Sequence, residues 1–181
     1  MKYIFSPLMV LLLLSFRPFE GIYDITLTTI DGNKIELDQY KGKKLLILLL
    51  PLSARETTVF INDIARLQSK YKNSLVVIGI PAEEAGYKTQ DAGELKLIYK
   101  DIAANIIITE GQKVKKGTGQ SSLFQWLTSK DKNHHFDQDV RGVGSKFFVD
   151  EKGDLYAVIG PYLPLSNPLI DRILSRPLEN N

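Results

Sequence analysis

The sequence predicts an α/β protein with a central mixed sheet, helices on both sides and an N-terminal hairpin. Two near-continuous aliphatic runs, residues 44–50 and 75–80, have the composition of strands that are buried on both faces. An amphipathic segment lies between them, and the order strand, helix, strand implies a parallel pair joined by a right-handed crossover. A later pair of strands around a turn, within residues 146–159, adds an antiparallel part.

The first predicted element after Gly21 is a β-hairpin. Residues 22–27 and 34–37 alternate in polarity on either side of the turn sequence Asp31-Gly32-Asn33. An Asp-Gly turn between two such segments is a strong local signal for antiparallel strands.

The segment 58–71 is predicted to be a helix between the two buried strands. Its apolar side chains recur at the spacing of one helical face. They are Phe60, Ile64, Leu67 and Tyr71. Because threonine is favoured at helix starts, we expect Thr57 or Thr58 to cap the helix, with Ser53 in the preceding turn.

Shorter elements follow Pro81. We expect a short helix over 93–99, a short strand over 105–109 and a helix over 121–129, with Trp126 on or near its apolar face. Residues 131–140 are predicted to be a polar connection.

The chain ends in a hairpin and a helix. The strands 146–149 and 155–159 flank the turn sequence DEKGD, which predicts an antiparallel pair. Asn167 is the expected N-cap of a last helix through residue 174, with Pro168 at its first position. We therefore expect a single domain over residues 21–181.

Composition limits the possible functions. A net charge of +2 among 181 residues is too small to predict binding to nucleic acid or to an anionic membrane surface. The chain contains no cysteine, which excludes disulfides, thiolate metal sites and thiol catalysis in this sequence.

Residues 1–20 have features of a secretory signal peptide or an N-terminal anchor. Lys2 precedes the uncharged run 3–16, which is short for a membrane span, and Arg17-Pro18 closes it. A clear small-x-small cleavage site and a lipoprotein cysteine are both absent from this sequence. The alternative is that the run forms a buried strand or helix of the domain. We expect export to the periplasm or the extracellular space, with an uncleaved anchor left open.

Several stretches together resemble one known family. They are DGNKIELDQYKGK at 31–43, the strand 45–50 with the helix 58–71, GIP at 79–81, SLFQWL at 122–127 and KFFVDEKG at 146–153. In this order and at this spacing they resemble motifs of the glutathione peroxidases, over residues 22–174. The resemblance implies a thioredoxin-like fold. The order of the predicted strands and helices also favours this fold.

This sequence differs from the family at the positions that carry the chemistry. The resemblance implies a reactive cysteine or selenocysteine at Arg55, give or take one residue. It implies glutamine at Glu84 and a tryptophan-asparagine pair at Gly142-Val143. Every one of these positions has changed type, so no catalytic residue of the family is carried over.

The residues that remain favour weak alternatives. Peroxide reduction needs a thiolate or selenolate, and Ser53 would need a general base and an oxyanion hole to act as a nucleophile instead. Arg55, near a helix N-terminus, is compatible with an anion site, with an ion pair to Glu84 that closes the former cleft, or with a solvated surface position.

Other motifs give no strong prediction of a site. His134-His135 lies in a polar loop, where adjacent histidines are usually solvated rather than metal-bound. Lys113, Lys115 and Lys116 form a basic cluster without interleaved aromatic residues, a poor signal for nucleic acid. We predict no metal and no cofactor.

These observations predict an exported binding or interaction module without thiol peroxidase activity, whose partner is an unidentified protein or small molecule. The alternative is an oxidoreductase of the peroxidase family with residual or altered activity in the former cleft, using Ser53, Arg55 and Glu84. Membrane contact is expected only through residues 1–20, if they are retained.

Overall fold

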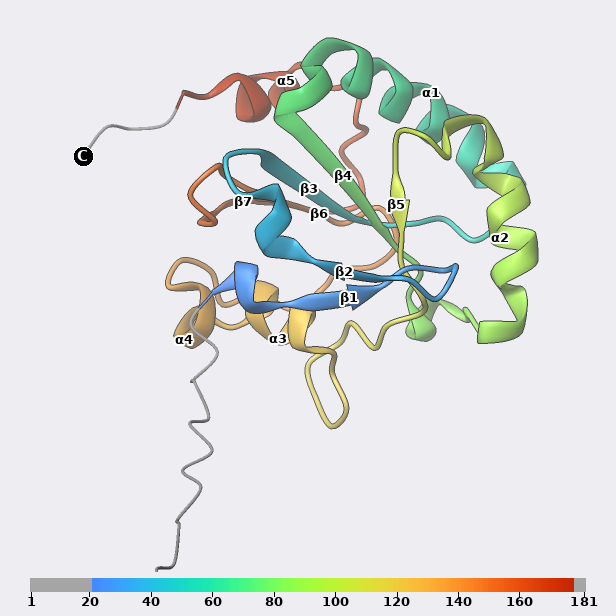
Figure 1. Cartoon of the computed structure of the whole chain (residues 1–181), viewed down its shortest axis with the longest axis horizontal. Coiled ribbons are helices and arrows are strands. Elements are labelled where there is room, and N and C mark those ends of the chain that lie inside the picture. The colour runs from blue at the N-terminus through green and yellow to red at the C-terminus, as the bar shows by residue number, and fades with distance from the viewer. Residues whose placement is uncertain (1–20, 178–181) are drawn as a thin grey trace, which may run out of the picture.

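The structure is a computed structural model that describes the backbone of residues 21–177 and the side chains of residues 21–53 and 60–177. A five-stranded mixed sheet of order β5-β4-β3-β6-β7 forms the middle layer. Helices α1, α2 and α5 pack on one face, and α3 packs with the separate β1–β2 hairpin on the other (Figure 1). The predicted fold class is confirmed.

The elements follow the order that the sequence predicts. The strands are β1 Thr26–Thr28, β2 Lys34–Glu36, β3 Lys44–Leu49, β4 Leu75–Ile80, β5 Ile107–Ile108, β6 Lys146–Val149 and β7 Leu155–Ile159. The α-helices are α1 Ala54–Tyr71, α2 Ala92–Ile98, α3 Ser122–Thr128, α4 Lys130–Asn133 and α5 Pro168–Ser175.

Strand β3 is buried on both faces because the sheet has a hydrophobic core on each side. Alternate β3 residues point to opposite faces, as the period of a strand requires. Leu45, Ile47 and Leu49 belong to the core beneath α3, which we call the α3-side core. Leu46 and Leu48 belong to the core beneath α1 and α5, the α1-side core. The aliphatic run in the sequence is explained by this double burial.

Parallel pairing of β3 with β4 is confirmed, with Lys44 opposite Leu75 and Leu49 opposite Ile80. β6 pairs with β3 in the antiparallel sense, and β7 continues the sheet beyond it. The predicted C-terminal hairpin therefore supplies the antiparallel half of the mixed sheet.

The N-terminal hairpin is confirmed, but its first strand is shorter than predicted. Ile22–Asp24 forms a turn of 3-10 helix, and pairing begins at Thr26, opposite Glu36. Beyond the paired residues, the hairpin reaches the edge of the main sheet, where the Ile30 N–H donates to the Ile108 carbonyl at 2.9 Å.

Helix α1 begins earlier than its apolar periodicity indicates. It starts at Ala54, with Ser53 in extended conformation at the N-cap position, so the expectation that Thr57 or Thr58 caps the helix is wrong. Both threonines lie within the helix. The physical reason is that helix propensities of ordinary residues differ by less than about 1 kcal/mol, so a polar first turn can be helical without an apolar signal.

The remaining elements match their predictions within a few residues, with one addition. Residues 130–133 form the short helix α4, inside a segment predicted to be a polar connection. A single polar turn has no apolar repeat for the sequence to reveal. The predicted N-cap of α5 is confirmed, because the Asn167 Oδ1 accepts a hydrogen bond from the Leu169 N–H at 2.9 Å.

Within the described part of the chain, no helix is both long enough and apolar enough to span a membrane. The predicted signal peptide or anchor at residues 1–20 lies outside the described residues.

Candidate functional site

Three loops meet where β3 and β4 end and β6 begins. The Leu50 N–H donates to the Ile80 carbonyl at 2.9 Å, which joins the end of β3 to the end of β4. On the other side of β3, the Gly144 N–H donates to the Leu49 carbonyl at 2.9 Å. We call this end of the sheet the family-site edge, because the loops that follow β3 and β4 and precede β6 carry all the positions predicted to match the family's site.

Ser53 lies at this edge as the N-cap residue of α1. Its side chain is exposed and makes no capping hydrogen bond to the helix. Arg55 is the second residue of the same helix, so the prediction that it lies near a helix N-terminus is confirmed. Its side chain lies outside the described residues, so its pairing with Glu84 stays a prediction.

Tyr99 fixes the loop that leads to Ser53. This tyrosine lies just after α2 and is fully buried, and its hydroxyl donates to the Pro51 carbonyl at 3.0 Å. Burial raises the pKa of Tyr99 well above its usual range, so the hydroxyl keeps its proton near neutral pH. This contact could not be predicted from the sequence, because no local pattern links residues 48 positions apart.

Glu84 is engaged by the backbone of a distant loop. One carboxylate oxygen, Oε1, accepts from the Val114 and Lys115 N–H groups at 3.0 Å, and Oε2 accepts from the Val114 N–H at 3.1 Å. Partial burial raises the pKa of Glu84, but backbone hydrogen bonds, chiefly from Lys115 and Val114, and the positive charge of Lys115 lower it, and the net shift is downward. Glu84 therefore acts as an ionised clamp on the loop after Gln112.

Gly142 and Val143 form a tight turn in front of β6. Gly142 has a φ of +135°, in the region that favours glycine, and its carbonyl accepts from the Ser145 N–H at 3.1 Å. A Cβ built on Gly142 meets nothing within 4 Å. Backbone conformation, rather than lack of space, therefore disfavours a bulky residue such as tryptophan at this position.

Lys146 is a buried cation next to this turn, and it is not among the site residues that the sequence predicts. Its ammonium donates to the Gly144 carbonyl at 2.5 Å and the Gly160 carbonyl at 3.4 Å, and its residue is 1% exposed. Burial lowers the pKa of Lys146 to about 8, although the negative charge of Asp63 on α1 acts in the opposite direction. A lysine at the start of a strand gives no sequence signal for burial.

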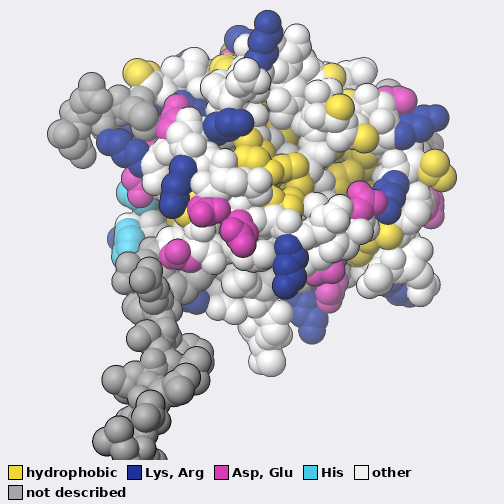
Figure 2. Space-filling model, viewed as in Figure 1, with side chains coloured by type: hydrophobic (Ala, Val, Ile, Leu, Met, Phe, Trp, Pro, Cys, Tyr) yellow, Lys and Arg dark blue, Asp and Glu magenta, His cyan; other side chains and the backbone are white. Residues whose placement is uncertain are grey.

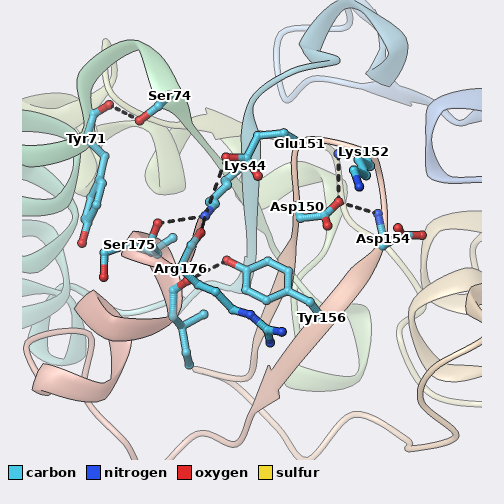
Figure 3. A network of polar contacts seen from close by, with 12 residues as sticks. Lys44, Tyr71, Ser74, Asp150, Glu151, Lys152, Asp154, Tyr156, Ser175 and Arg176 are labelled. Atoms are coloured by element: carbon cyan, nitrogen blue, oxygen red, sulfur yellow. Dashed lines mark hydrogen bonds and ion pairs between the residues drawn. The ribbon is translucent and has the colours of Figure 1, made fainter. Parts of the chain in front are cut away.

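The opposite end of the sheet carries a different polar network (Figure 3). The Lys44 ammonium donates to the carbonyls of Leu174, at 3.1 Å, and Arg176, and it lies 3.7 Å from Glu151 Oε1. It also lies 5.7 Å from the centre of the Tyr156 ring. These contacts hold the end of α5 against β3 and β7, so the network has a structural explanation.

The other motifs of the sequence have mainly structural contacts. Trp126 is 3% exposed in the α3-side core, so the prediction that it lies at the apolar face of its helix is confirmed. Lys115 donates to the Val140 carbonyl, and Lys116 forms a 2.5 Å ion pair with Asp137. His135 Nε2 lies 4.0 Å from Asp154 Oδ1. Among the described residues, no group of three or more His, Cys, Asp or Glu residues is arranged to hold a metal.

The described chemistry of the family-site edge is therefore limited. It contains an exposed hydroxyl at Ser53, a carboxylate at Glu84 that is occupied by amide donors, and a buried ammonium at Lys146 that is bonded to carbonyls. None of these groups is a thiol or selenol, the nucleophiles that reduce peroxides efficiently.

Comparisons with known proteins agree with the fold. The sequence profile described as glutathione peroxidase matches residues 22–128, more than half of the chain. The glutathione peroxidase homolog BsaA of Staphylococcus aureus (strain MW2) is 28% identical over 152 residues, which cover 83% of this chain and 93% of that protein.

Solved structures show the same architecture. T. cruzi GPX1 superposes with a TM-score of 0.61 at 19% identity, covering 85% of this chain and 94% of that one. A thiol:disulfide interchange protein of the thioredoxin family from Chlorobium tepidum TLS gives a TM-score of 0.59 at 17% identity, covering 87% and 94% of the two chains. At these identities the likeness supports the thioredoxin-like fold alone.

Proposed function

The chain belongs to the glutathione peroxidase family, and on this basis we propose that it is an exported binding or interaction protein without thiol peroxidase activity. The observation that carries the proposal is the complete absence of cysteine from the sequence of a family member. An alcohol is a poor substitute for a thiol, because it is scarcely ionised at neutral pH and reacts poorly with the soft oxygen of a peroxide.

The geometry of the family-site edge supports the same proposal. Glu84 uses both carboxylate oxygens to bind the Val114 and Lys115 amides, so both are already engaged in holding a loop. Gly142 adopts a conformation that suits glycine rather than a large aromatic residue. These features support a structural use of positions that the resemblance aligns with the family's catalytic residues.

A peroxidase assay tests the central claim. The purified full chain should consume hydrogen peroxide at the rate of the buffer alone, with either glutathione or a thioredoxin system as reductant. Sustained turnover in proportion to protein concentration would show that another group does the chemistry and would refute the proposal.

Cysteine substitution tests whether the thiol is the missing component. We expect Arg55→Cys to give a thiol that peroxide oxidises faster than the thiol of a matched control, because a helix N-terminus lowers a thiol pKa. Lys34→Cys is a suitable control, since Lys34 is exposed and belongs to strand β2 rather than to the first turn of an α-helix. Equal oxidation rates in the two variants would argue that the family-site edge no longer activates a thiol.

Ser53 supports one alternative, an enzyme with altered activity at the former site. The exposed Ser53 hydroxyl makes no capping bond, and among the described residues no side chain is hydrogen-bonded to it. A catalytic serine would react with a fluorophosphonate probe, and Ser53→Ala would abolish the labelling. Absence of labelling in the parent chain would remove this alternative.

Export is the part of the proposal that rests on the N-terminal sequence alone. Lys2 and the apolar run up to residue 16 support secretion, with residues 1–20 either removed or kept as an anchor. Expression in a bacterial host, followed by cell fractionation and N-terminal sequencing of the mature protein, distinguishes cleavage, anchoring and retention in the cytoplasm. Recovery of the full chain in the cytosolic fraction would contradict export.

A further inference from the structure

A groove beside strand β5 is lined mainly by apolar side chains and has a volume of about 440 Å³. The hairpin, β5 and the segment that follows α2 form its walls. Its apolar lining includes Ile30, Ile35, Tyr99, Ala103, Ile106 and Ile107. Figure 2 shows hydrophobic side chains gathered in the middle of the face viewed in Figure 1. We call this surface the β5 groove.

The rim of the β5 groove is positively charged. Lys96 and Lys100 both line it and are one helical turn apart in sequence. Lys96 pairs with Asp31 at 2.5 Å, which neutralises one positive charge. Lys100 is exposed and forms no ion pair with a residue of the described chain. The groove thus combines an apolar wall with one uncompensated cation.

We propose that the β5 groove binds a free single-chain carboxylate amphiphile, such as a long-chain fatty acid. Its hydrocarbon chain would replace water on Ile30, Ala103 and Ile107, the apolar lining residues that are at least partly exposed, and this is the main source of affinity for an apolar surface. Its carboxylate would lie beside the Lys100 ammonium, where an anion is favoured and a cation is repelled. The positive charge of the rim thus favours a negatively charged head group over a positively charged one.

The form of the groove favours a free ligand over a membrane surface. Its walls are the hairpin on one side and the segment after α2 on the other, so the apolar side chains lie in a depression rather than on a flat or protruding surface. A flat bilayer would contact the rim first, whereas a single hydrocarbon chain can enter. The groove also includes Tyr99, whose hydroxyl holds Pro51 at the family-site edge.

Isothermal titration calorimetry of the full chain with dodecanoate, below its micelle concentration, tests the inference. We expect saturable binding, weaker by about threefold or more for dodecylammonium, which has the same chain and the opposite charge. Lys100→Glu should weaken dodecanoate binding by a similar factor, whereas the control Lys88→Glu changes an exposed lysine outside the groove and should have little effect.

Two matched variants that add a phenyl ring test whether the ligand binds in the groove or at another apolar segment. Residues 1–20 are the same in both variants, so binding there would be unchanged. Ala103→Phe fills the groove and should weaken binding by about tenfold, because the contact area is lost. Ala104→Phe adds the same ring at an exposed neighbour that does not line the groove, and should retain parent affinity. Circular dichroism spectra and melting curves establish that both variants are folded.

Three results of the binding experiments would overturn the inference. The first is that dodecanoate shows no saturable binding. The second is that Ala103→Phe and Ala104→Phe weaken binding equally. The third is that the protein binds dodecanoate and dodecylammonium with equal affinity. Co-sedimentation of the protein with phosphatidylcholine–phosphatidylglycerol vesicles, without binding to monomeric dodecanoate, would instead identify a membrane-binding surface and also overturn it.

Discussion

Lys146 shows how a single buried charge can make the stability of this protein depend on pH. Its ammonium is removed from solvent, bonded to the carbonyls of Gly144 and Gly160, and faces Asp63 of α1. Burial lowers its pKa from 10.5 to about 8. Between these two values the unfolded chain binds more protons than the folded one, so stability rises with pH in this window.

We therefore predict that the free energy of unfolding rises between pH 7 and pH 9.5 in the parent protein and rises less in Lys146→Met. The full contribution is at most about 3 kcal/mol, from a pKa difference of about two and a half. Urea unfolding at several pH values measures it. Above pH 10 the raised pKa values of Tyr23 and Tyr71, both about 12, act in the opposite direction, so the comparison stops below that pH. Parallel pH profiles in the two proteins would contradict the prediction.

Glu84 leads to a second prediction at the scale of the residue. Glu84→Ala removes the acceptor for the Val114 and Lys115 amides, so these amides should exchange with deuterium faster, with a loss of about 1 kcal/mol in stability. Because the pKa of Glu84 is lowered in the fold, the same protection should fall in the parent as acid protonates the carboxylate, below its usual pKa of 4.5.

Glu83→Ala provides the control for this experiment. Glu83 belongs to the same 3-10 turn, and its backbone N–H, rather than its side chain, bonds to the Gln112 carbonyl. Exchange at Val114 should therefore stay near the parent rate in Glu83→Ala. Equal acceleration in both variants would indicate a general loosening of the turn rather than the loss of the clamp.

At the scale of the element, the two long helices differ in how they start. Asn167 caps α5 through its side chain, whereas Ser53 occupies the N-cap position of α1 without such a bond. Two residues that are both favoured at N-cap positions therefore contribute differently to the stability of their helices. The sequence predicted the start of α5 correctly, whereas it placed the start of α1 four residues too late because the first turn of α1 has no apolar repeat.

We predict that Asn167→Ala destabilises the protein by about 1 kcal/mol, while Ser53→Ala costs only a few tenths of that amount, because one substitution removes a capping bond and the other does not. Thermal and urea unfolding of the two variants measure the difference. A loss in Ser53→Ala as large as that in Asn167→Ala would show that the Ser53 hydroxyl does cap α1 in solution.

At the scale of the whole molecule, the two cores share one sheet and should unfold together. Trp126 is the sole tryptophan and lies in the α3-side core, whereas Leu48 lies in the α1-side core. We predict that Leu48→Ala lowers stability by about 2–5 kcal/mol and shifts the Trp126 fluorescence transition as far as the far-ultraviolet circular dichroism transition. A fluorescence transition that stays in place would mean that the two faces unfold independently.

Most of the fold could be predicted from the sequence, because its signals are local. Double-sided burial makes β3 and β4 continuously aliphatic, and turn residues mark both hairpins within a few positions. Among the exceptions, α4 and the first turn of α1 are polar segments without an apolar repeat. For the candidate site, the sequence identified the changed positions but not their contacts.

The order of the elements, the likeness to glutathione peroxidases and the absence of a thiol can all be read along the chain without a structure. Three features became visible only in the folded chain: Glu84 clamps the loop at Val114, Tyr99 holds Pro51, and Lys146 is buried. The physical reason is that each of these depends on groups from other elements. Their positions are set when the two cores pack against the sheet.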